Sequence, residues 1–391
     1  MHLCGPVKCL LTINAGSSSL KVAVFRAEKL DRLATVKVTS IGHAATVTSS
    51  ISGLRQTEPL SGVGDHDAAL VAALDLLDSH LGRTDWTAIG HRVTHGGAYL
   101  RPQIVDAAVW SAIETLVPLA PIHQPHNLAG IAAAKRLAPR ALQVACFDTS
   151  FHRTIPDVAK RYALPHALST EGIEAYGFHG LSYEYIASVL PKHLGPRANG
   201  RVIVAHLGSG ASMCAMRERQ SVATTMGLTP LDGLPMATRS GAVDPGVILH
   251  LLEARKMSVA AVRDLLYLRS GLLGVSGISD SMKELVNSPD RRAAEAVELF
   301  VYRAAREIGS LASALGGLDA VVFTGGIGEN SSAIRSQIAD AIAWLGVERD
   351  EGADADGQVV FSTPTSRVSL CVIATDEEAV IARHTAEFRG G

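Results

Sequence analysis

The sequence has little net charge and few aromatic residues. Its 391 residues carry a formal net charge of −2, and Phe, Trp and Tyr together make up 5% of the chain. Because a nearly neutral chain has no overall positive field, we expect no binding to nucleic acid or to an anionic membrane surface. Any anionic ligand must then be held by local groups, and aliphatic side chains must fill most of the core.

Cysteines and long apolar runs are also scarce. The five cysteines are scattered and never form a C-x-x-C pair, which is typical of a protein from a reducing compartment. They are Cys4, Cys9, Cys146, Cys214 and Cys371. The start of the chain has no basic segment followed by a long apolar run, and no apolar segment approaches the roughly 20 residues that span a bilayer. We therefore expect a cytoplasmic protein without a membrane-spanning segment.

The most specific nucleotide-binding loops are missing, because neither G-x-x-x-x-G-K-[ST] nor G-x-G-x-x-G occurs. Glycine is nevertheless abundant, and three glycine-rich turns follow apolar strands: "NAGSSS" at 14–19, "HLGSGAS" at 206–212 and "TGGIGENS" at 324–331. Successive backbone N–H groups in such turns form concavities that bind anions. Any one of them alone is more often an ordinary tight turn, but their shared position after strands favours a phosphate site.

Helical and strand patterns alternate along the chain, which indicates α/β domains with helices covering a sheet. Size scaling favours two domains for a chain of this length. We predict an N-terminal domain over 1–150, on which the closing segment 377–391 packs back, and a C-terminal domain over 151–376. Strand–turn–strand units at 9–25 and 201–216 stand near the start of each half.

Individual elements follow from periodicity and from turn residues. Helices are predicted over 69–81, 106–117, 127–138, 182–193, 246–255, 258–268, 291–315, 331–345 and 377–388. Buried strands are predicted within 87–93, 143–148, 320–326 and 369–375. The acidic, glycine-containing segment 350–358 is predicted to be a solvated surface loop.

Two arginines lie in apolar or glycine-rich surroundings, Arg92 in "GHRVTHGG" and Arg239 in "MATRSG". A buried guanidinium needs an anion, and its planar fork matches the oxygens of a carboxylate or a phosphate. These residues are therefore candidate clamps for a small acid and a phosphoryl group. The alternative is a structural salt bridge, which is the commoner role of a buried arginine.

Two acidic residues follow apolar strands, Asp148 after "VACF" and Glu377 after "VIATD". Carboxylates in such positions could hold Mg²⁺, which prefers one or two of them together with substrate phosphates. The alternative is helix capping, and Asp376 is the expected cap of the last helix. His91 and His95 have a zinc-like spacing but lie in a strand and a glycine turn, so a structural role is favoured over a zinc site.

Taken together, these strings resemble the acetate kinase family, within the larger group of sugar kinases, heat-shock chaperones and actin. The resemblance extends from residue 10 to about residue 388. Its landmarks are "NAGSSSLK", "GHRVTHGG", "APIHQPHN", "FDTSFHRTIP", "YGFHG", "HLGSGAS", "MGLTPLDGL", "TRSGAVDPG", "SGLLGVSGIS", "FTGGIGENS" and "TDEEAVIARHT".

The resemblance implies an α/β fold of two actin-like (ribonuclease H-like) domains, with mixed sheets flanked by helices and an active-site cleft between them. It also implies that Asn14 and Glu377 hold Mg²⁺ or Mn²⁺. Asp148 would be the acidic active-site residue, and His179 and Arg239 would stabilise the transferring phosphoryl group.

Substrate residues are implied in the same way, with Arg92 binding the substrate carboxylate. The walls of a small apolar pocket would be Val93, Ile122, Phe178 and Pro230. ATP or ADP would be bound by Lys21, His206, Leu207, Gly208, Ser209, Gly210, Ser281, Met282, Lys283, Gly326, Ile327, Gly328, Glu329 and Asn330.

This sequence departs from the family pattern at several of these places. Ser209 stands where many members have asparagine, and Thr94 replaces a usual valine in the acyl pocket. Ser281 and Lys283 replace aspartate and arginine beside the nucleoside, which removes a carboxylate and a planar stacking group. These changes leave the preferred acid and the preferred nucleotide open.

The implied reaction is reversible transfer of the γ-phosphoryl group of ATP to acetate by a homodimeric enzyme. Three alternatives remain. A propionate or butyrate kinase would use the same scaffold, because one carbon in an apolar pocket changes binding by only about 1–3 kcal/mol. A sugar kinase that phosphorylates a hydroxyl would need a base and a larger polar pocket, and a non-catalytic nucleotide-binding protein would not need the four residues Arg92, Asp148, His179 and Arg239.

Overall fold

The computed structural model describes residues 8–16, 19–51, 53–82 and 84–388. The chain divides into two compact units. The first comprises the described residues up to Ser150 together with those from Asp376 onward, and the second comprises Phe151–Thr375. Cys4, the middle of the 14–19 turn and residues 389–391 of the predicted closing segment lie outside the described residues.

The first unit is built on one mixed sheet of eight strands in the order β5-β4-β3-β2-β1-β6-β8-β7. Strand β1 pairs antiparallel with β2 and parallel with β6, and β6 in turn pairs parallel with β8. The strands are β1 (Lys8–Ala15), β2 (Ser19–Arg26), β3 (Arg32–Thr39), β4 (Thr46–Ile51), β5 (Leu54–Pro59), β6 (Asp85–Val93), β7 (Gln103–Ile104) and β8 (Leu142–Phe147).

Helices cover both faces of this sheet. On one face α1 (His66–Leu81) and α3 (Gln124–Leu137) pack on β1 and its neighbours, and α2 (Ala107–Thr115) packs beside α3. The alternation of β1 explains why both faces are covered: Leu11 and Ile13 join the core under α1, whereas Leu10 joins the core on the other face.

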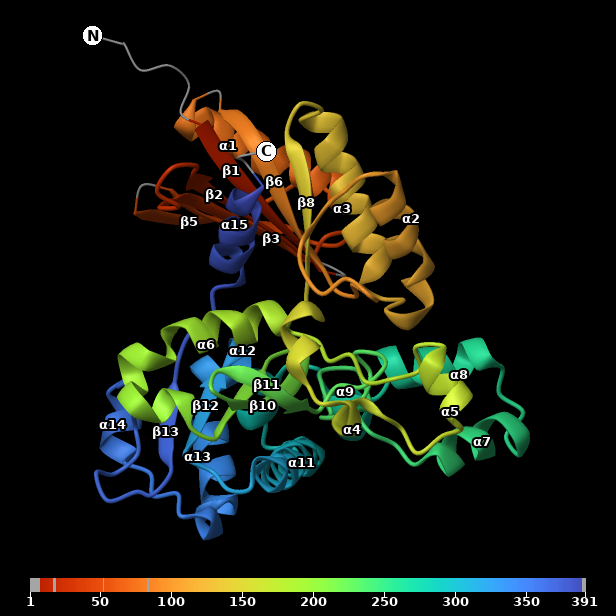
Figure 1. Ribbon diagram of the computed structural model, residues 1–391, viewed down its shortest axis with the longest axis vertical. Coiled ribbons are helices and arrows are strands. Elements are labelled where there is room, and N and C mark those ends of the chain that lie inside the picture. The colour runs from red at the N-terminus through yellow and green to blue at the C-terminus, as the bar shows by residue number, and fades with distance from the viewer. Residues whose placement is uncertain (1–7, 17–18, 52, 83, 389–391) are drawn as a thin grey trace. The chain divides into compact units, whose positions relative to one another are not determined.

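The last helix, α15 (Glu377–Glu387), covers that other face, as Figure 1 shows beside β1 and β6. Its approach to β6 depends on a glycine. A Cβ on Gly90 would lie 2.1 Å from Thr385 Oγ1 and 2.5 Å from Ile381 Cγ2. Only a residue without a side chain lets the closing helix lie this close to the sheet.

The second unit is built on a five-stranded mixed sheet in the order β11-β10-β9-β12-β13. Strand β9 pairs antiparallel with β10 and parallel with β12, which pairs parallel with β13. The strands are β9 (Val202–Leu207), β10 (Ala211–Arg217), β11 (Gln220–Thr224), β12 (Ala320–Thr324) and β13 (Ser369–Val372).

The two faces of this sheet have different helical covers. Ile203 and Leu207 of β9 share a core with α11 (Arg291–Leu315), while Val202 and Val204 share a core with α6 (Gly180–Leu194). The predicted helix 291–315 has the observed bounds of α11, because Asp290 accepts a hydrogen bond from Arg292 N at its start and Gly316 adopts a left-handed φ of 70° at its end. None of the described helices is both long and apolar enough to cross a membrane.

Shorter helices complete the second unit, and several lie in a lobe of their own in Figure 1. The shorter helices of the whole unit are α4 (Asp157–Lys160), α5 (His166–Thr170), α7 (Pro245–Glu253), α8 (Val259–Leu268), α9 (Gly271–Ser276), α10 (Met282–Val286), α12 (Gly325–Asn330), α13 (Ser332–Ala341) and α14 (Glu351–Ala355).

Two local predictions were wrong. The segment 350–358 is not a solvated loop, because it contains α14 and buries Asp354, whose side chain pairs with Arg335. The segment 324–331 is not a simple turn, because Gly325–Asn330 forms α12. In both cases a contact distant in sequence stabilises a helix that local composition disfavours.

The neutral imidazole of His91 makes the stability of the first unit depend on pH. His91 in β6 is buried and donates from Nε2 to Gln143 Oε1 at 2.7 Å. Burial lowers its pKa from 6.5 to about 4, although the bond to Gln143 opposes this shift. Between these values the unfolded chain binds a proton that the folded chain does not, so stability is complete above about pH 6.5 and falls toward pH 4.

We expect His91→Gln to reduce this loss, by up to about 3 kcal/mol in the free energy of unfolding at about 1.4 kcal/mol per pKa unit. Glutamine keeps a donor for Gln143 and does not titrate. Urea unfolding at a series of pH values checks this, with His250→Gln at an exposed position of α7 as control. Equal pH dependence in both variants would contradict the prediction.

Candidate functional site

In the first unit, polar residues gather where three neighbouring parallel strands end. Asn14 lies near the end of β1, Arg92 near the end of β6, and Asp148 directly after β8. Glu377, the first residue of α15, joins them. The carboxyl ends of parallel strands are the usual ligand-binding edge of an α/β sheet.

Arg92 is the centre of this cluster. Its Nη2 donates to Asp148 Oδ2 at 2.7 Å, and its Nε contacts both carboxylate oxygens at 3.1 Å. Its Nη1 donates to Asn14 Oδ1 at 3.2 Å and lies 3.8 Å from Glu377 Oε2. The salt bridge that the sequence left open for Arg92 is therefore present.

The charges of this cluster compensate one another in a mostly buried place. Asp148 has no exposed surface, and the Arg92 side chain is 17% exposed. Burial lowers the pKa of Arg92, but the charges of Asp148 and Glu377 raise it more, so the net pKa lies above its usual range. The guanidinium stays charged and keeps a partly exposed edge for an anionic ligand.

The start of α15 adds a second set of polar contacts. Asn14 Nδ2 donates to Glu377 Oε2 at 2.9 Å, and Lys21 Nζ pairs with the buried Glu378 at 2.5 Å. Asp376 caps α15 by accepting from Ala379 N, as predicted. Glu377 therefore projects toward the cluster rather than capping the helix itself.

The donors of this cluster fit a magnesium ion. Asn14 supplies an amide oxygen, and Glu377 and Asp148 supply carboxylate oxygens, which are the hard ligands that Mg²⁺ prefers. Within the part of the chain that the structure describes, no group of three or more His, Cys, Asp or Glu side chains could hold a metal. Mg²⁺ does not need such a group, because substrate phosphates and water complete its coordination.

The residues predicted to wall the acid pocket differ in their surroundings. Val93 has no exposed surface and belongs to the core cluster with Ile113 and Phe147. Ile122 is half-buried and lies in the same unit. Phe178 and Pro230 are buried in the second unit.

In the second unit, two predicted glycine turns lie side by side because β9 and β12 are neighbouring parallel strands. A Cβ on Gly208 would lie 3.6 Å from Gly326 N, and one on Gly325 would lie 2.8 Å from Leu207 O. Gly325 also has a φ of +78°. At Gly325 the two turns approach each other more closely than a Cβ would permit.

His179 and Arg239 meet at the first of these turns. A Cβ on Gly210 would lie 2.6 Å from Arg239 Nη2 and 3.2 Å from His179 Nε2. His179 adopts a left-handed φ of 57° just before α6, and Arg239 Nη1 donates to Pro230 O at 2.5 Å. Two side chains able to donate to a phosphoryl oxygen are thus brought to one glycine.

The ring of His179 stacks on that of His206, with centroids 4.4 Å apart and planes inclined by 26°. Each ring also contacts a serine hydroxyl: His179 Nδ1 lies 2.8 Å from Ser212 Oγ, and His206 Nδ1 lies 2.8 Å from Ser182 Oγ. Sequence reasoning did not single out either serine, although Ser212 closes the "HLGSGAS" string.

Other predicted nucleotide residues hold the local backbone instead of projecting outward. Glu329 Oε1 accepts from Gly325 N at 2.8 Å and from Thr375 N at 3.1 Å, and Asn330 Nδ2 donates to Gly326 O at 2.9 Å. The side chains of Glu329 and Asn330 therefore bond to the backbone of α12 and its surroundings. Gly326 and Asn330 remain exposed.

The 281–283 segment places its three side chains differently. Ser281 caps α10 by accepting from Glu284 N, and Met282 is buried in the core, whereas Lys283 is exposed. Ile327 is half-buried against the same core, and Ser209 is exposed with its carbonyl bound to Ala237 N.

A buried arginine that the sequence did not reveal supports α12. Arg335 of α13 donates through Nη1 to the carbonyls of Gly328 at 2.9 Å and Glu329 at 3.0 Å. Its Nε and Nη2 donate to Asp354 Oδ1, and both side chains are 6% exposed. Sequence distance hides this pair, because no local pattern links α13 to α14.

We expect Asp354→Asn to lower the free energy of unfolding by about 3–5 kcal/mol, because it leaves the guanidinium of Arg335 buried without its counter-ion. Urea unfolding measures this. Asp340→Asn removes one of the two acidic partners of Arg349, at a carboxylate that is 60% exposed, and should cost about 1 kcal/mol or less. Similar losses in the two variants would show that the buried pair is not critical.

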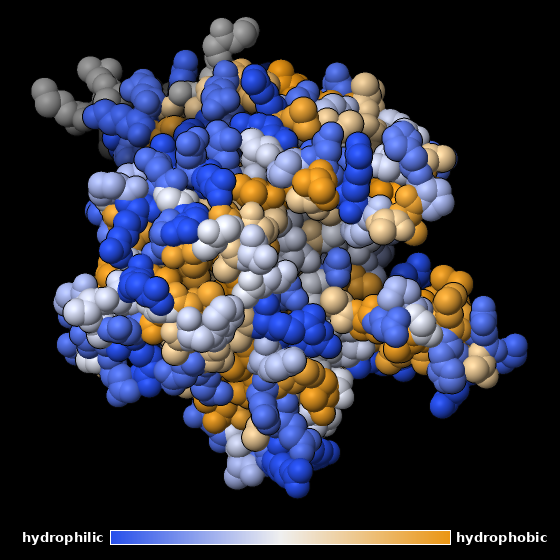
Figure 2. Space-filling model, turned by 60° about the horizontal axis from the view of Figure 1, so that its bottom comes forward, coloured by the Kyte–Doolittle hydropathy of each residue, from blue (hydrophilic) through white to orange (hydrophobic). Residues whose placement is uncertain are grey.

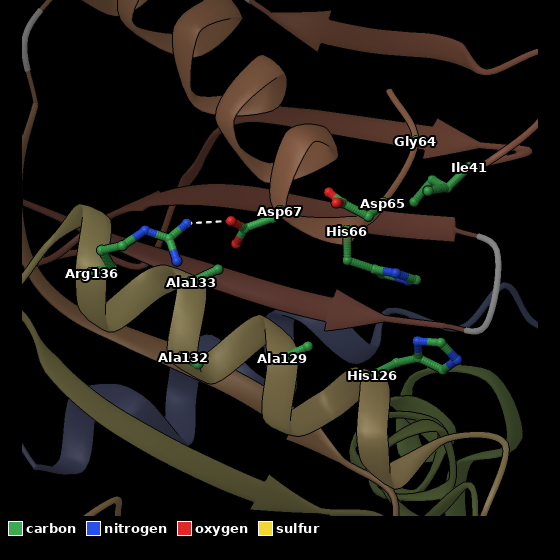
Figure 3. Close-up of a pocket in the computed structure, with 10 residues that line it drawn as sticks. All are labelled: Ile41, Gly64, Asp65, His66, Asp67, His126, Ala129, Ala132, Ala133 and Arg136. Carbon is green, nitrogen blue, oxygen red and sulfur yellow. Dashed lines mark hydrogen bonds and ion pairs between the residues drawn. The ribbon is translucent and has the colours of Figure 1, made fainter. Parts of the chain in front are cut away.

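A pocket of about 570 Å³ opens elsewhere in the first unit, between α1 and α3 (Figure 3). Its wall includes His66 and His126, whose ring centroids are 4.7 Å apart, and the exposed pair Asp67–Arg136. None of the predicted site residues lines it. His66 Nε2 donates to Gly16 O at 2.5 Å, in the segment that follows β1.

The fold is shared with solved structures of a propionate kinase and an acetate kinase. A propionate kinase from Francisella tularensis subsp. tularensis SCHU S4 matches with a TM-score of 0.88 and 35% identity, over 97% of this chain and 99% of that one. The acetate kinase of Porphyromonas gingivalis matches with a TM-score of 0.83 and 34% identity over the same shares.

Sequence comparison gives the family. The acetate kinase of Rhodopseudomonas palustris (strain TIE-1) is 49% identical over 98% of each chain. The pattern of the acetokinase family matches residues 9–383. The chain therefore belongs to the acetokinase family, whose members are kinases that transfer phosphate to a carboxylate.

Proposed function

We propose that this protein is an acetate kinase, which reversibly transfers the γ-phosphoryl group of ATP to acetate and gives acetyl phosphate and ADP. The observation that carries the proposal is the meeting of His179 Nε2 and Arg239 Nη2 at Gly210, beside two glycine turns. Phosphoryl transfer depends on positioning and on stabilisation of charge, and these groups supply both.

The nucleotide is assigned to the turns of the second unit. A Cβ on Gly326 would meet no atom within 4 Å, and the glycines of the neighbouring turn let Arg239 and His179 approach the backbone at Gly210. Arg239 and His179 then donate to the phosphoryl group that moves. Lys21 is assigned to the phosphates, because its ammonium group has three N–H donors and is partly exposed while it pairs with Glu378.

The acid is assigned to Arg92. Its fork is held by Asp148 and Asn14, so the guanidinium is fixed before the acid binds, and its exposed edge can pair with a carboxylate. A carboxylate is already ionised at neutral pH and needs no strong general base. Asp148 therefore acts by positioning Arg92 and by its charge.

A divalent ion, Mg²⁺ or Mn²⁺, is assigned to Asn14 and Glu377. When bound, such an ion neutralises the charge of the phosphates in phosphoryl transfer. Asn14 and Glu377 are held together by their own hydrogen bond, which orients the oxygens of both side chains. A cytoplasmic location is part of the proposal and is supported by the scattered cysteines.

Propionate is the second candidate substrate. The Francisella tularensis protein named propionate kinase has a TM-score of 0.88 to this chain, which is the specific observation in its favour. One carbon changes binding in an apolar pocket by only about 1–3 kcal/mol. Thr94, which is buried next to Val93, is the residue most able to change this choice.

Hydroxylamine trapping of the acyl phosphate tests the reaction. With ATP and Mg²⁺, we expect most hydroxamate from acetate, less from propionate and butyrate, and none from glycerol. Arg92→Ala should lower kcat/KM for acetate by at least about 100-fold, because it removes the clamp for the carboxylate. Thr94→Val, assayed with the same acids, shows whether the hydroxyl selects among them.

The controls separate loss of folding from loss of function. Arg92→Ala removes the buried ion pair with Asp148, so thermal unfolding and ATP binding must be measured on this variant as well. A folded protein that binds ATP and yields no hydroxamate with any acid would overturn the proposed function. A stronger signal from propionate would move the assignment to that acid.

The proposal includes a homodimer formed through the second unit. Helix α7 buries none of its residues, and apolar side chains on α7, α8 and the segments beside them are exposed. Figure 2 shows apolar surface on the lobe that carries these helices in Figure 1. The exposed apolar side chains include Val243, Val247, Leu249, Val259 and Leu268. An uncovered apolar face of this kind is typical of an interface.

We expect Leu249→Glu to convert the dimer to a monomer, because it places a charge in the apolar contact. Sedimentation velocity measures the mass. Leu54→Glu, at a position of β5 that is 71% exposed, is the matched control and should leave the dimer intact. A monomeric wild-type protein, or a Leu249→Glu variant that stays dimeric, would contradict this interface.

A further inference from the structure

The stacked rings of His179 and His206 are each connected to a chain of two hydroxyl groups. His206 contacts Ser182, which contacts Thr375, and His179 contacts Ser212, which contacts Tyr183. Ser182, Tyr183 and Ser212 are fully buried, so these contacts replace water as hydrogen-bond partners. The direction in which the hydroxyl groups of each chain donate their hydrogen bonds decides which ring nitrogen carries the proton.

In the chain beside His206, the serine donates its hydrogen bond away from the ring. Ser182 Oγ donates its one proton to Thr375 Oγ1 at 2.8 Å. The same oxygen lies 2.8 Å from His206 Nδ1 and can then only accept at that contact. His206 is therefore protonated on Nδ1, and in the neutral ring Nε2 keeps its lone pair.

In the chain beside His179, the hydroxyl groups donate their hydrogen bonds toward the ring. Tyr183 Oη and Ser212 Oγ are 2.5 Å apart, and the phenol is the stronger acid of the two and hence the better donor. The proton of Ser212 is then directed to His179 Nδ1 at 2.8 Å. With Nδ1 accepting, the neutral ring of His179 carries its proton on Nε2, the atom that faces Gly210 and Arg239.

We propose that the two histidines hold opposite tautomers, Nε2–H on His179 and Nδ1–H on His206, and that Tyr183 and Ser212 are positioning residues that fix the first. The tautomers rest on the hydroxyl contacts alone. The catalytic consequence rests on the proposed function: His179 presents a hydrogen-bond donor at Gly210 as a neutral ring, with no need to become an imidazolium. A cation there would lie beside Arg239 and would be opposed by its charge.

The tautomers can be read directly in the ligand-free protein. Protein labelled with ¹⁵N in the histidine rings is studied by long-range ¹H–¹⁵N correlation at pH 8, where protonated and unprotonated ring nitrogens have well-separated shifts. His179→Asn and His206→Asn each remove one ring and so assign the two patterns. The proposal expects Nε2–H for His179 and Nδ1–H for His206, and the reverse pattern for His179 would overturn it.

Two variants test the positioning role. Tyr183→Phe removes the phenol that fixes Ser212, and we expect the His179 pattern to move toward Nδ1–H. Ser212→Ala removes the contact to the ring and is a second route to the same change. The kcat of each should fall by about tenfold to a hundredfold, somewhat less than the 10²- to 10³-fold typical of losing an oxyanion donor outright.

Three further readouts separate positioning from a general structural effect. The KM for acetate should stay nearly unchanged, because Arg92 belongs to the other unit. The kcat of Tyr183→Phe should recover as the pH is lowered, because an imidazolium has N–H on both nitrogens. Tyr185→Phe, on the same helix, should change neither the spectrum of His179 nor kcat.

The possible results decide between the two claims. If Tyr183→Phe leaves the His179 tautomer or kcat unchanged, Tyr183 is not a positioning residue and the proposal fails. If the tautomers are as expected but the wild type makes no acyl hydroxamate, the assignment of protons stands and the proposed reaction fails. Ser182→Ala should alter only the His206 pattern, and a change at His179 in that variant would also count against separate chains.

Discussion

Parallel pairing of neighbouring strands is the constraint on which both clusters depend. In the first unit β1, β6 and β8 run in one direction, and in the second β9, β12 and β13 do so. Residues that follow these strands must therefore meet at one edge of each sheet. Asn14, Arg92 and Asp148 meet in this way, and so do the turn after β9 and helix α12.

The residues at each edge need compensation for their charges, and the structure provides it locally. Asp148 is fully buried and Arg92 mostly so, yet the fork of the guanidinium satisfies both carboxylate oxygens. Arg335 and Asp354 form a second buried ion pair behind α12, in which two guanidinium nitrogens donate to one carboxylate oxygen. Such pairs contribute little net stability, but they fix the position of the groups they hold because breaking them is costly.

Several parts of the fold and the site could be predicted from short segments of sequence. The caps of α11 and α15 are local, since Asp290 and Asp376 each bond to the first turn of the helix that follows. The α/β class, the helix bounds near 291–315 and the family follow from such local patterns and from the ordered motifs. The partners of Arg92 and Arg239 could not be predicted. A buried arginine needs an anion or an acceptor, but the residues around it in the sequence do not identify which one.

The sequence by itself determined the class of fold and the family, because periodicity, turn glycines and motif order are properties of neighbouring residues. It also supplied the candidate residues for binding phosphate and carboxylate, which remain a prediction. The tertiary structure alone decided which of them meet. It paired Arg92 with Asp148 and directed the Glu329 side chain to the backbone N–H of Gly325 at the start of α12. It also placed Ser212 in contact with His179, and Tyr183 in contact with Ser212. These contacts join residues that are distant in the chain or depend on the path of the backbone, and burial makes each partner a matter of three-dimensional packing.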